Sequence, residues 1–197
     1  MDLLTPDADL DGLTLTGESL DGQDGESARI LECAFEACSL DGVRLDHARV
    51  LDTALTACRA GELSMPSSTW QDGRWSDLRI GALVAYGSSW DRVRVTGGKL
   101  DFVNLRDARL TDVTFEGVTI DELDLARVTG RRVRFAECRV RRLDVTGAAL
   151  TDVDLRGVSG LARLDGVTSL RGATISGDQL VELAPALAAA AGITVAG

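Results

Sequence analysis

A large apolar side chain recurs at every fifth position of this 197-residue chain, from residue 10 to residue 155. Of the 30 positions in that series, 26 hold a large apolar residue, and the exceptions are Gly25, Ala60, Ala85 and Gly130. The phase of the series never shifts. A second residue, mostly small or β-branched, lies two positions before each large one. The residues on either side of the large one are mostly polar.

A period of five fits neither a single α-helix nor a flat strand. Five residues advance a helix by about 140°, which scatters the apolar positions around it. In a strand, steps of five alternate between the two faces. Short extended edges joined by corners do fit, because residues two apart on an edge point the same way. Glycine often follows the large residue by two, as at Gly12 and Gly42, where a tight turn favours it. Such coils must stack to bury their interior.

The repeating unit resembles A-[DN]-L-x-x, the motif of the pentapeptide-repeat proteins. It appears as Ala8-Asp9-Leu10, Ala108-Arg109-Leu110, Ala148-Ala149-Leu150 and Val153-Asp154-Leu155. The resemblance covers roughly residues 8–157 and implies an all-β solenoid, namely a right-handed quadrilateral β-helix with four pentapeptides per coil. Residues 20 apart then stack, so that Trp70 lies beneath Trp90, Phe115 beneath Phe135 and Cys38 beneath Cys58. The 30 units make about 7.5 coils, or a rod of roughly 36 Å at a strand spacing of about 4.8 Å.

Two parts of the chain are expected, residues 1–157 as the β-helix with acidic N-terminal coils and residues 158–197 as a separate ending. Within the first part, residues 56–69 predict a bulge or small loop, because Pro66 lacks a ladder donor. The second part opens with an irregular last coil at residues 158–169. There Leu161, Leu164 and Val167 are three apart and predict a helical turn.

The C-terminal segment predicts a capping α-helix followed by a short strand at residues 193–195. The helix starts near Ser176, ends at Gly192 and contains Pro185, which predicts a kink or an interrupted ladder. Its apolar stripe is Leu180, Val181, Leu183, Ala184, Leu187 and Ala188. One face is expected to cover the open end of the rod. The tail also resembles that of the mycobacterial fluoroquinolone-resistance pentapeptide-repeat proteins, which interact with DNA gyrase, and this resemblance implies a homodimer through the helix.

Charge is distributed unevenly along the chain. It holds 31 acidic and 21 basic residues, a formal charge of −10, and residues 1–27 contribute eight acids and no base. The candidate acidic partner-binding surface is Asp9, Asp11, Glu18, Asp21, Asp24 and Glu26. Residues 127–142 reverse the sign, with seven arginines against one glutamate. The candidate basic band is Arg131, Arg132, Arg141 and Arg142, which we interpret as an ordinary solvated face, with polyanion binding as the alternative. The acidic balance disfavours direct nucleic-acid binding and favours a basic protein partner.

Residues that carry chemistry are few, so we expect a non-enzymatic protein without cofactor or metal. His47 is the one histidine and falls at a corner. The cysteines all take the small inward position, which predicts buried, reduced thiols, and they are Cys33, Cys38, Cys58 and Cys138. They lack metal-ligand spacing. The acidic pair Asp121 and Glu122 points outward with no cleft to tune it. No secretory signal or membrane-spanning run is visible, so we expect a cytoplasmic protein.

Three functional hypotheses follow. The resemblance implies a DNA mimic that binds DNA gyrase or another topoisomerase, modulating it or conferring quinolone resistance. The alternative is a rigid protein-interaction scaffold with another partner, and the third is a polyanion binder acting through the basic band. A dimer would carry one net charge per roughly 3.6 Å of its length, less than half the charge density of duplex DNA at about one per 1.7 Å. Charge density therefore gives mimicry weak support.

Overall fold

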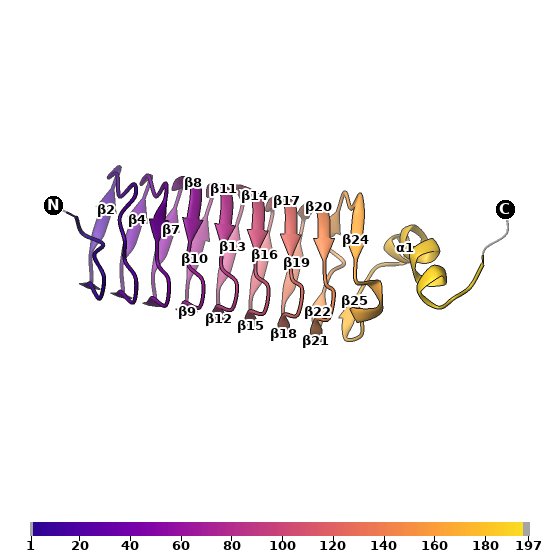
Figure 1. Ribbon diagram of the computed structural model, residues 1–197. Coiled ribbons are helices and arrows are strands. Elements are labelled where there is room, and N and C mark those ends of the chain that lie inside the picture. The colour runs from indigo at the N-terminus through magenta and orange to yellow at the C-terminus, as the bar shows by residue number, and fades with distance from the viewer. Residues whose placement is uncertain (1, 195–197) are drawn as a thin grey trace.

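The computed structural model describes residues 2–194, which form a straight rod of stacked coils that ends in one helix (Figure 1). The strands build three parallel sheets along the rod. The first contains β1 (Asp9–Asp11), β3 (Arg29–Leu31), β6 (Arg49–Leu51), β9 (Thr69–Gln71), β12 (Ser89–Asp91), β15 (Arg109–Thr111), β18 (Thr129–Arg131) and β21 (Ala149–Thr151). The second contains β2 (Thr14–Thr16), β4 (Ala34–Glu36), β7 (Ala54–Thr56), β10 (Arg74–Ser76), β13 (Arg94–Thr96), β16 (Thr114–Glu116), β19 (Arg134–Ala136), β22 (Val153–Asp154) and β25 (Ala173–Thr174).

The third sheet supplies the remaining two sides of the rod. It contains β5 (Val43–Arg44), β8 (Arg59–Ser64), β11 (Arg79–Val84), β14 (Lys99–Asn104), β17 (Thr119–Asp124), β20 (Cys138–Asp144) and β23 (Val158–Ser159), with β24 (Arg163–Asp165) paired to β20. In β8 the buried residues Ala60 and Leu63 are three apart, with two exposed residues between them. Because alternation is reset there, each long strand of this sheet passes around a corner. The rod therefore has four sides, as expected for a quadrilateral coil.

We name the four sides for the rest of the text. Face A is the first sheet and face B the second. Face C is formed by the first halves of the long strands, such as residues 59–61, and face D by their second halves and the turns that follow, such as residues 63–66. Trp70 pairs with Trp90 and Phe115 with Phe135 in neighbouring strands, which confirms the expected 20-residue stacking.

The interior is filled by the residues of the five-residue series. The Trp75 ring lies between those of Trp70 and Trp90, with centroids 4.9 Å apart in both pairs. The Phe115 and Phe135 rings are stacked at 4.9 Å with an interplanar angle of 5°. All four cysteines are buried and free, as the sequence predicted, and burial raises the pKa of the Cys58 and Cys138 thiols.

The predicted bulge at residues 56–69 is wrong. Residues Arg59–Ser64 form an unbroken strand, and Pro66 sits in the turn after it. In later coils the backbone N–H at the equivalent position bonds a side chain instead of the ladder, as Arg106 does to Asn104 and Ala126 to Asp124. Proline therefore removes no ladder bond at this position.

The last coil is more regular than predicted. Arg142 of β20 pairs with Arg163 of β24 at a separation of 21 residues, whereas Cys138 pairs with Val158 and Val153 with Ala173 at the usual 20. One extra residue thus shifts the phase locally and is compensated before β25, which explains both the break in the five-residue pattern and its return. The expected helical turn is present only as the 3₁₀ helix η1 (Val167–Ser169), while Arg163–Asp165 is strand.

Helix α1 (Gly177–Ala190) closes the chain. Ser176 caps it through a capping box with Gln179, and Gly192 follows the helix with φ of 73°. The helix runs through Pro185, as it is one continuous element. The expected strand at 193–195 is absent at Ile193 and Thr194, and Val195 lies outside the described residues.

Candidate functional site

The six residues of the predicted acidic surface lie at one end of the rod but not on one face. Asp9 and Asp11 are on face A, whereas Asp21 is on face C. Asp24 and Glu26 are on face D, where Asp24 forms a bridge with Arg44 in the next coil. The sixth, Glu18, is exposed at the start of face C. The structure therefore places these carboxylates around the N-terminal coils as a collar.

The net charge of the whole chain resides in these coils. Residues 1–46 hold 12 acidic and 2 basic residues, a balance of −10, which equals that of the whole chain. Residues 47–197 hold 19 of each sign and are neutral as a group. Within residues 2–194, Asp9, Asp11, Glu18 and Glu26 form no ion pair, whereas Arg44 contacts Asp24 at 3.2 Å. The acidic end is thus largely uncompensated.

Asp21 of this acidic set also stabilises the backbone of the next coil. Asp21 Oδ1 accepts a hydrogen bond from the Asp41 backbone N–H at 2.9 Å, and Asp41 Oδ1 accepts from the backbone of Gly61 at 2.7 Å. A hydrogen bond from the Ser39 side chain, followed by that from the Asp41 backbone, lowers the pKa of Asp21. The lowered pKa keeps Asp21 ionised, and the hydrogen bonds that Asp21 and Asp41 accept fix the coil edge on face C.

The predicted basic band does not form one surface. Arg131 lies on face A and Arg132 at the corner after it, while Arg141 and Arg142 lie on β20, across the corner between faces C and D. Two Arg132 nitrogens contact the Asp112 carboxylate at 2.5 Å each. Arg142 contacts Glu122 at 2.9 Å and Arg141 approaches the same carboxylate at 3.8 Å. Three of the four arginines are therefore ion-paired and the four are separated, so the structure brings no polyanion site together here.

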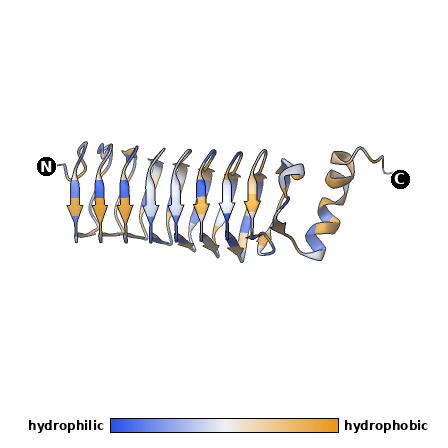
Figure 2. Cartoon of the chain, turned by 90° about the horizontal axis from the view of Figure 1, so that it is seen from below, coloured by the Kyte–Doolittle hydropathy of each residue, from blue (hydrophilic) through white to orange (hydrophobic). Residues whose placement is uncertain are grey.

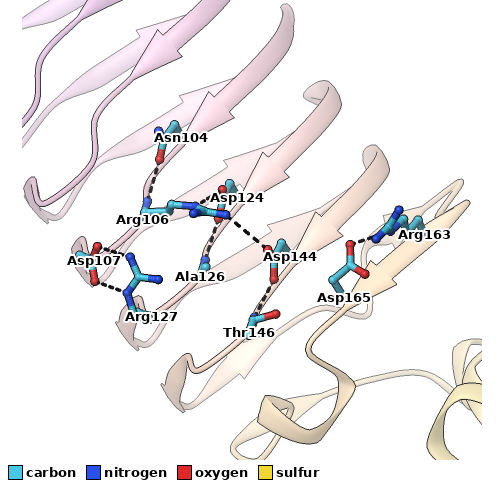
Figure 3. Close-up of polar contacts among 10 residues, drawn as sticks. All are labelled: Asn104, Arg106, Asp107, Asp124, Ala126, Arg127, Asp144, Thr146, Arg163 and Asp165. Carbon is cyan, nitrogen blue, oxygen red and sulfur yellow. Dashed lines mark hydrogen bonds and ion pairs between the residues drawn. The ribbon is translucent and has the colours of Figure 1, made fainter. Parts of the chain in front are cut away.

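Face D carries a ladder of carboxylates near the C-terminal end (Figure 3). Asp124, Asp144 and Asp165 are partners in neighbouring strands. The Arg106 guanidinium contacts Asp124 and lies 3.8 Å from Asp144 Oδ2, and Arg163 contacts Asp165 at 2.7 Å. Two of these carboxylates therefore have a close arginine, whereas Asp144 has only the distant one.

Asp144 stays ionised although it is partly buried. Burial acts to raise its pKa, but hydrogen bonds from the Thr146 side chain and backbone and the positive charge of Arg106 outweigh it and lower the pKa below the ordinary value. The Thr146 backbone N–H donates to Asp144 Oδ1 at 2.8 Å. This carboxylate is therefore held in place, charged and incompletely neutralised.

Two exposed aromatic side chains on the same face were not singled out from the sequence. Tyr86 is 47% exposed and Phe102 is 36% exposed. Both lie outside the five-residue series, which is why the inward pattern passes over them. A comparison of outward residues 20 apart would have identified them. At the position of Tyr86 neighbouring coils carry Pro66 and Arg106, and at the position of Phe102 other coils carry Glu62 and Glu122.

Helix α1 divides the predicted apolar stripe between the rod and solvent. The Gln179 side chain is buried, and its Nε2 donates to the carbonyl oxygens of Leu155 and Val158 at 2.8 Å each. These bonds attach the helix to the last coil. Leu180 is 52% and Val181 is 74% exposed. Ala184 is exposed, whereas Leu183, Leu187 and Ala188 are half-buried. In Figure 2 much of the ribbon of α1 carries the colour of apolar residues.

Groups of metal ligands and membrane-spanning helices are two further features to consider. Among residues 2–194 no three histidine, cysteine or carboxylate side chains are grouped as metal ligands. In the same part of the chain, no helix is both long and apolar enough to cross a membrane.

Comparisons with known proteins give distant matches. No protein-family model and no curated protein matches the sequence. Among solved structures, the chain is similar to HetL, a pentapeptide repeat protein involved in heterocyst differentiation regulation from the cyanobacterium Nostoc sp. strain PCC 7120. That likeness has 15% identity and a TM-score of 0.43 over 80% of this chain and 90% of that one. QnrB1, a plasmid-mediated fluoroquinolone resistance protein, matches in a trypsin-treated form with 14% identity and a TM-score of 0.30, over 96% of this chain and all of that one. The full-length form matches with 15% identity and a TM-score of 0.26, over 91% and 99%.

Proposed function

We propose that this β-solenoid of pentapeptide repeats is a non-enzymatic protein-binding rod whose acidic N-terminal coils bind a basic surface of a partner protein. The observation that carries the proposal is the partition of charge, with −10 in residues 1–46 and none beyond them. A uniform excess would only keep the rod soluble, whereas a concentrated one steers an oppositely charged partner to one end. The exposed carboxylates are suited to binding, because they lack the burial that tunes a catalytic acid or base.

The partner we propose is the DNA-binding surface of DNA gyrase, a basic surface that a polyanion occupies. Support for this choice comes from the C-terminal tail, whose sequence resembles that of gyrase-interacting pentapeptide-repeat proteins. The contact is expected at the acidic end and not along the whole length, because beyond residue 46 face A carries Arg49, Arg109 and Arg131, which form no ion pair within residues 2–194. Another protein with a basic surface is the alternative, which keeps the rod as a scaffold.

We also propose that the chain forms a homodimer through α1. Leu180 and Val181 are exposed on a helix that is tied to the rod by its Gln179 side. Pairing two such helices would bury apolar surface that water now covers. The two acidic ends would then lie at opposite tips of a double-length rod. We expect this assembly in the cytoplasm, where the four buried thiols remain reduced.

The test is a gyrase supercoiling assay titrated with the protein, with and without a fluoroquinolone. We expect inhibition or drug protection at low micromolar concentration, and its loss in the variant Asp9→Lys, Asp11→Lys, Glu26→Lys. These three carboxylates are exposed and make no ion pair in the described chain, so their reversal leaves the coil intact.

The matched control reverses three other exposed carboxylates, Asp77, Glu137 and Asp152, in the neutral part of the rod. It changes the net charge by the same amount at a different place. No effect of the wild-type protein up to tens of micromolar would exclude gyrase as the partner. Equal loss in both variants would show that net charge and not the acidic end matters.

A further inference from the structure

The body of the rod exposes few large apolar side chains. Between residues 9 and 165 they are Leu51, Tyr86 and Phe102. Leu51 lies on face A, while Tyr86 and Phe102 belong to neighbouring coils of face D. Val84 and Asn104 are paired in β11 and β14, Tyr86 follows Val84 by two residues, and Phe102 precedes Asn104 by two. The two aromatic side chains therefore lie on either side of one strand pair.

Face D is uncharged between the two aromatics and ionised around them, because Phe102 pairs with Ala82 on one side and with Glu122 on the other. The uncharged outward residues come from three successive coils and are bordered by Glu62 and Arg106, and they are Ser64, Pro66, Val84, Tyr86 and Asn104. Toward the N-terminus the face continues with Asp24, Arg44 and Asp46. Toward the C-terminus it continues with Arg106 and the carboxylate ladder that ends at Asp165. An aromatic centre with a charged rim is the arrangement found at the energetic centre of protein interfaces.

A hollow of about 180 Å³ opens beside Phe102. Its lining joins the Phe102 ring and Leu123 to the carboxylates of Glu122, Asp124, Asp144 and Asp165. Arg106 and Arg142 also line it. Arg106 is ion-paired with Asp124, and Arg142 is ion-paired with Glu122. The oriented, ionised Asp144 is the carboxylate left for an incoming cation, which would at the same time contact the aromatic ring.

We propose that face D, from Asp24 to Asp165, docks a basic segment of a partner protein, with Tyr86 and Phe102 as its apolar anchors. A lysine or arginine of that segment enters the hollow between Phe102 and Asp144. The acidic flanks require a positively charged partner segment. The aromatic centre requires that this segment carry apolar side chains between its basic ones. The inference rests on the proposed function and names the face on which the partner lies once the acidic end has attracted it.

The test uses two synthetic peptides of 16 residues with equal positive charge. One spaces its lysines with glycine and serine, and the other replaces the serines by leucine. Binding is measured by fluorescence anisotropy at low and at moderate salt. We expect the leucine peptide to bind about tenfold more tightly or better. The variant Tyr86→Ser, Phe102→Ser removes that difference, whereas Leu51→Ser on face A preserves it. Asp144→Asn weakens the leucine peptide several-fold and reduces its salt dependence.

The outcomes separate this inference from the function on which it rests. If both peptides bind alike and only the Asp9, Asp11, Glu26 reversal weakens them, the acidic end stands as a binding site and the inference fails. If neither peptide binds at low salt, both fail. If the aromatic variant lowers the sedimentation coefficient of the protein without peptide, face D contacts a second copy and the inference is overturned. The fluorescence of the buried Trp70, Trp75 and Trp90 verifies that each variant is folded.

Discussion

Corner residues are where single side chains of this protein conflict most with their backbone. Among residues 2–194, seventeen residues other than glycine adopt a positive φ, and Ala57 does so at 52°. An L-residue with a Cβ atom in this region costs about 1 kcal/mol relative to glycine, and alanine has no side-chain hydrogen bond to offset it. Aspartate, which is frequent at these corners, tolerates the conformation better.

Ala57→Gly is therefore expected to stabilise the protein by up to about 1 kcal/mol. The control Ala54→Gly, three residues earlier in β7, removes a side chain from extended backbone and is expected to destabilise by roughly 0.5–1 kcal/mol. Urea unfolding followed by tryptophan fluorescence measures both. Destabilisation by both variants would mean that the Ala57 corner is unstrained.

Gln179 is the second residue whose role is specific. Its amide bonds two carbonyl oxygens of the last coil, and its Oε1 accepts from the Ser176 backbone N–H at 2.8 Å. Gln179→Ala removes the donor to the Val158 carbonyl and the second donor to the Leu155 carbonyl, which still accepts from the Val158 backbone N–H, and it opens the capping box, at a cost of about 2 kcal/mol to the docking of α1. Hydrogen exchange should quicken in β25 and in α1 and stay unchanged in β14. The exposed Glu182→Ala is the control, and unchanged exchange in β25 would show that α1 docks by other contacts.

At the scale of elements, successive coils are joined on their outside by ion pairs between residues 20 apart. The carboxylates of Asp72, Asp107 and Asp112 each bind the arginine of the next coil through two hydrogen bonds. In each case the hydrogen bonds from the arginine are the main cause that lowers the pKa of the carboxyl group. Arg92, Arg127 and Arg132 are those partners.

These lowered pKa values fix the sign of the pH dependence. The unfolded chain binds protons at these carboxyl groups at a higher pH than the folded chain does, because the folded pKa lies below the ordinary value of an aspartate. Their contribution to stability is thus present above about pH 4 and is lost as the pH falls through the folded pKa. Tm should fall between pH 5 and pH 3, less so at high salt. In Asp112→Asn the slope should be shallower, and an unchanged slope would contradict the assignment.

The elements follow from the sequence to the extent that they repeat. The five-residue series predicts the buried positions and the pairing of Trp70 with Trp90, because identical coils stack in only one register. It fails at Pro66 and at Arg163, where the outcome depends on which turn position a residue occupies and on one inserted residue. The acidic end depends only on position along the chain, so it could be predicted. Face D depends on which outward residues share one side of the rod, so it could not. The basic band was dispersed for the same reason, since Arg131 and Arg141 are ten residues, or half a coil, apart.

At the scale of the whole molecule, the acidic collar and α1 lie at opposite ends of the rod (Figure 1). The two functions proposed for them are therefore separable. Removing self-association should leave each protomer with its acidic collar and face D, while removing the collar should leave the dimer intact. In a dimer joined through α1, the two rods alone span roughly 72 Å, given about 7.5 coils per protomer at a spacing of about 4.8 Å, so the two collars stand at least that far apart. A partner with two basic surfaces then gains from simultaneous contact.

The last prediction uses this separation. Leu180→Asp with Val181→Asp places two charges on the exposed side of α1, opposite the Gln179 contact with the rod. Sedimentation should change from dimer to monomer, because a buried unpaired carboxylate costs several kcal/mol at an apolar interface. The leucine peptide should bind the monomer as tightly as the dimer, since face D is unaltered. The effect on gyrase should weaken more than peptide binding does, because the second collar is lost. The control Ala189→Asp lies on the same helix at an exposed position outside the predicted stripe. A dimer that survives the double change, or a wild-type protein that sediments as a monomer, would show that α1 only covers the end of the rod.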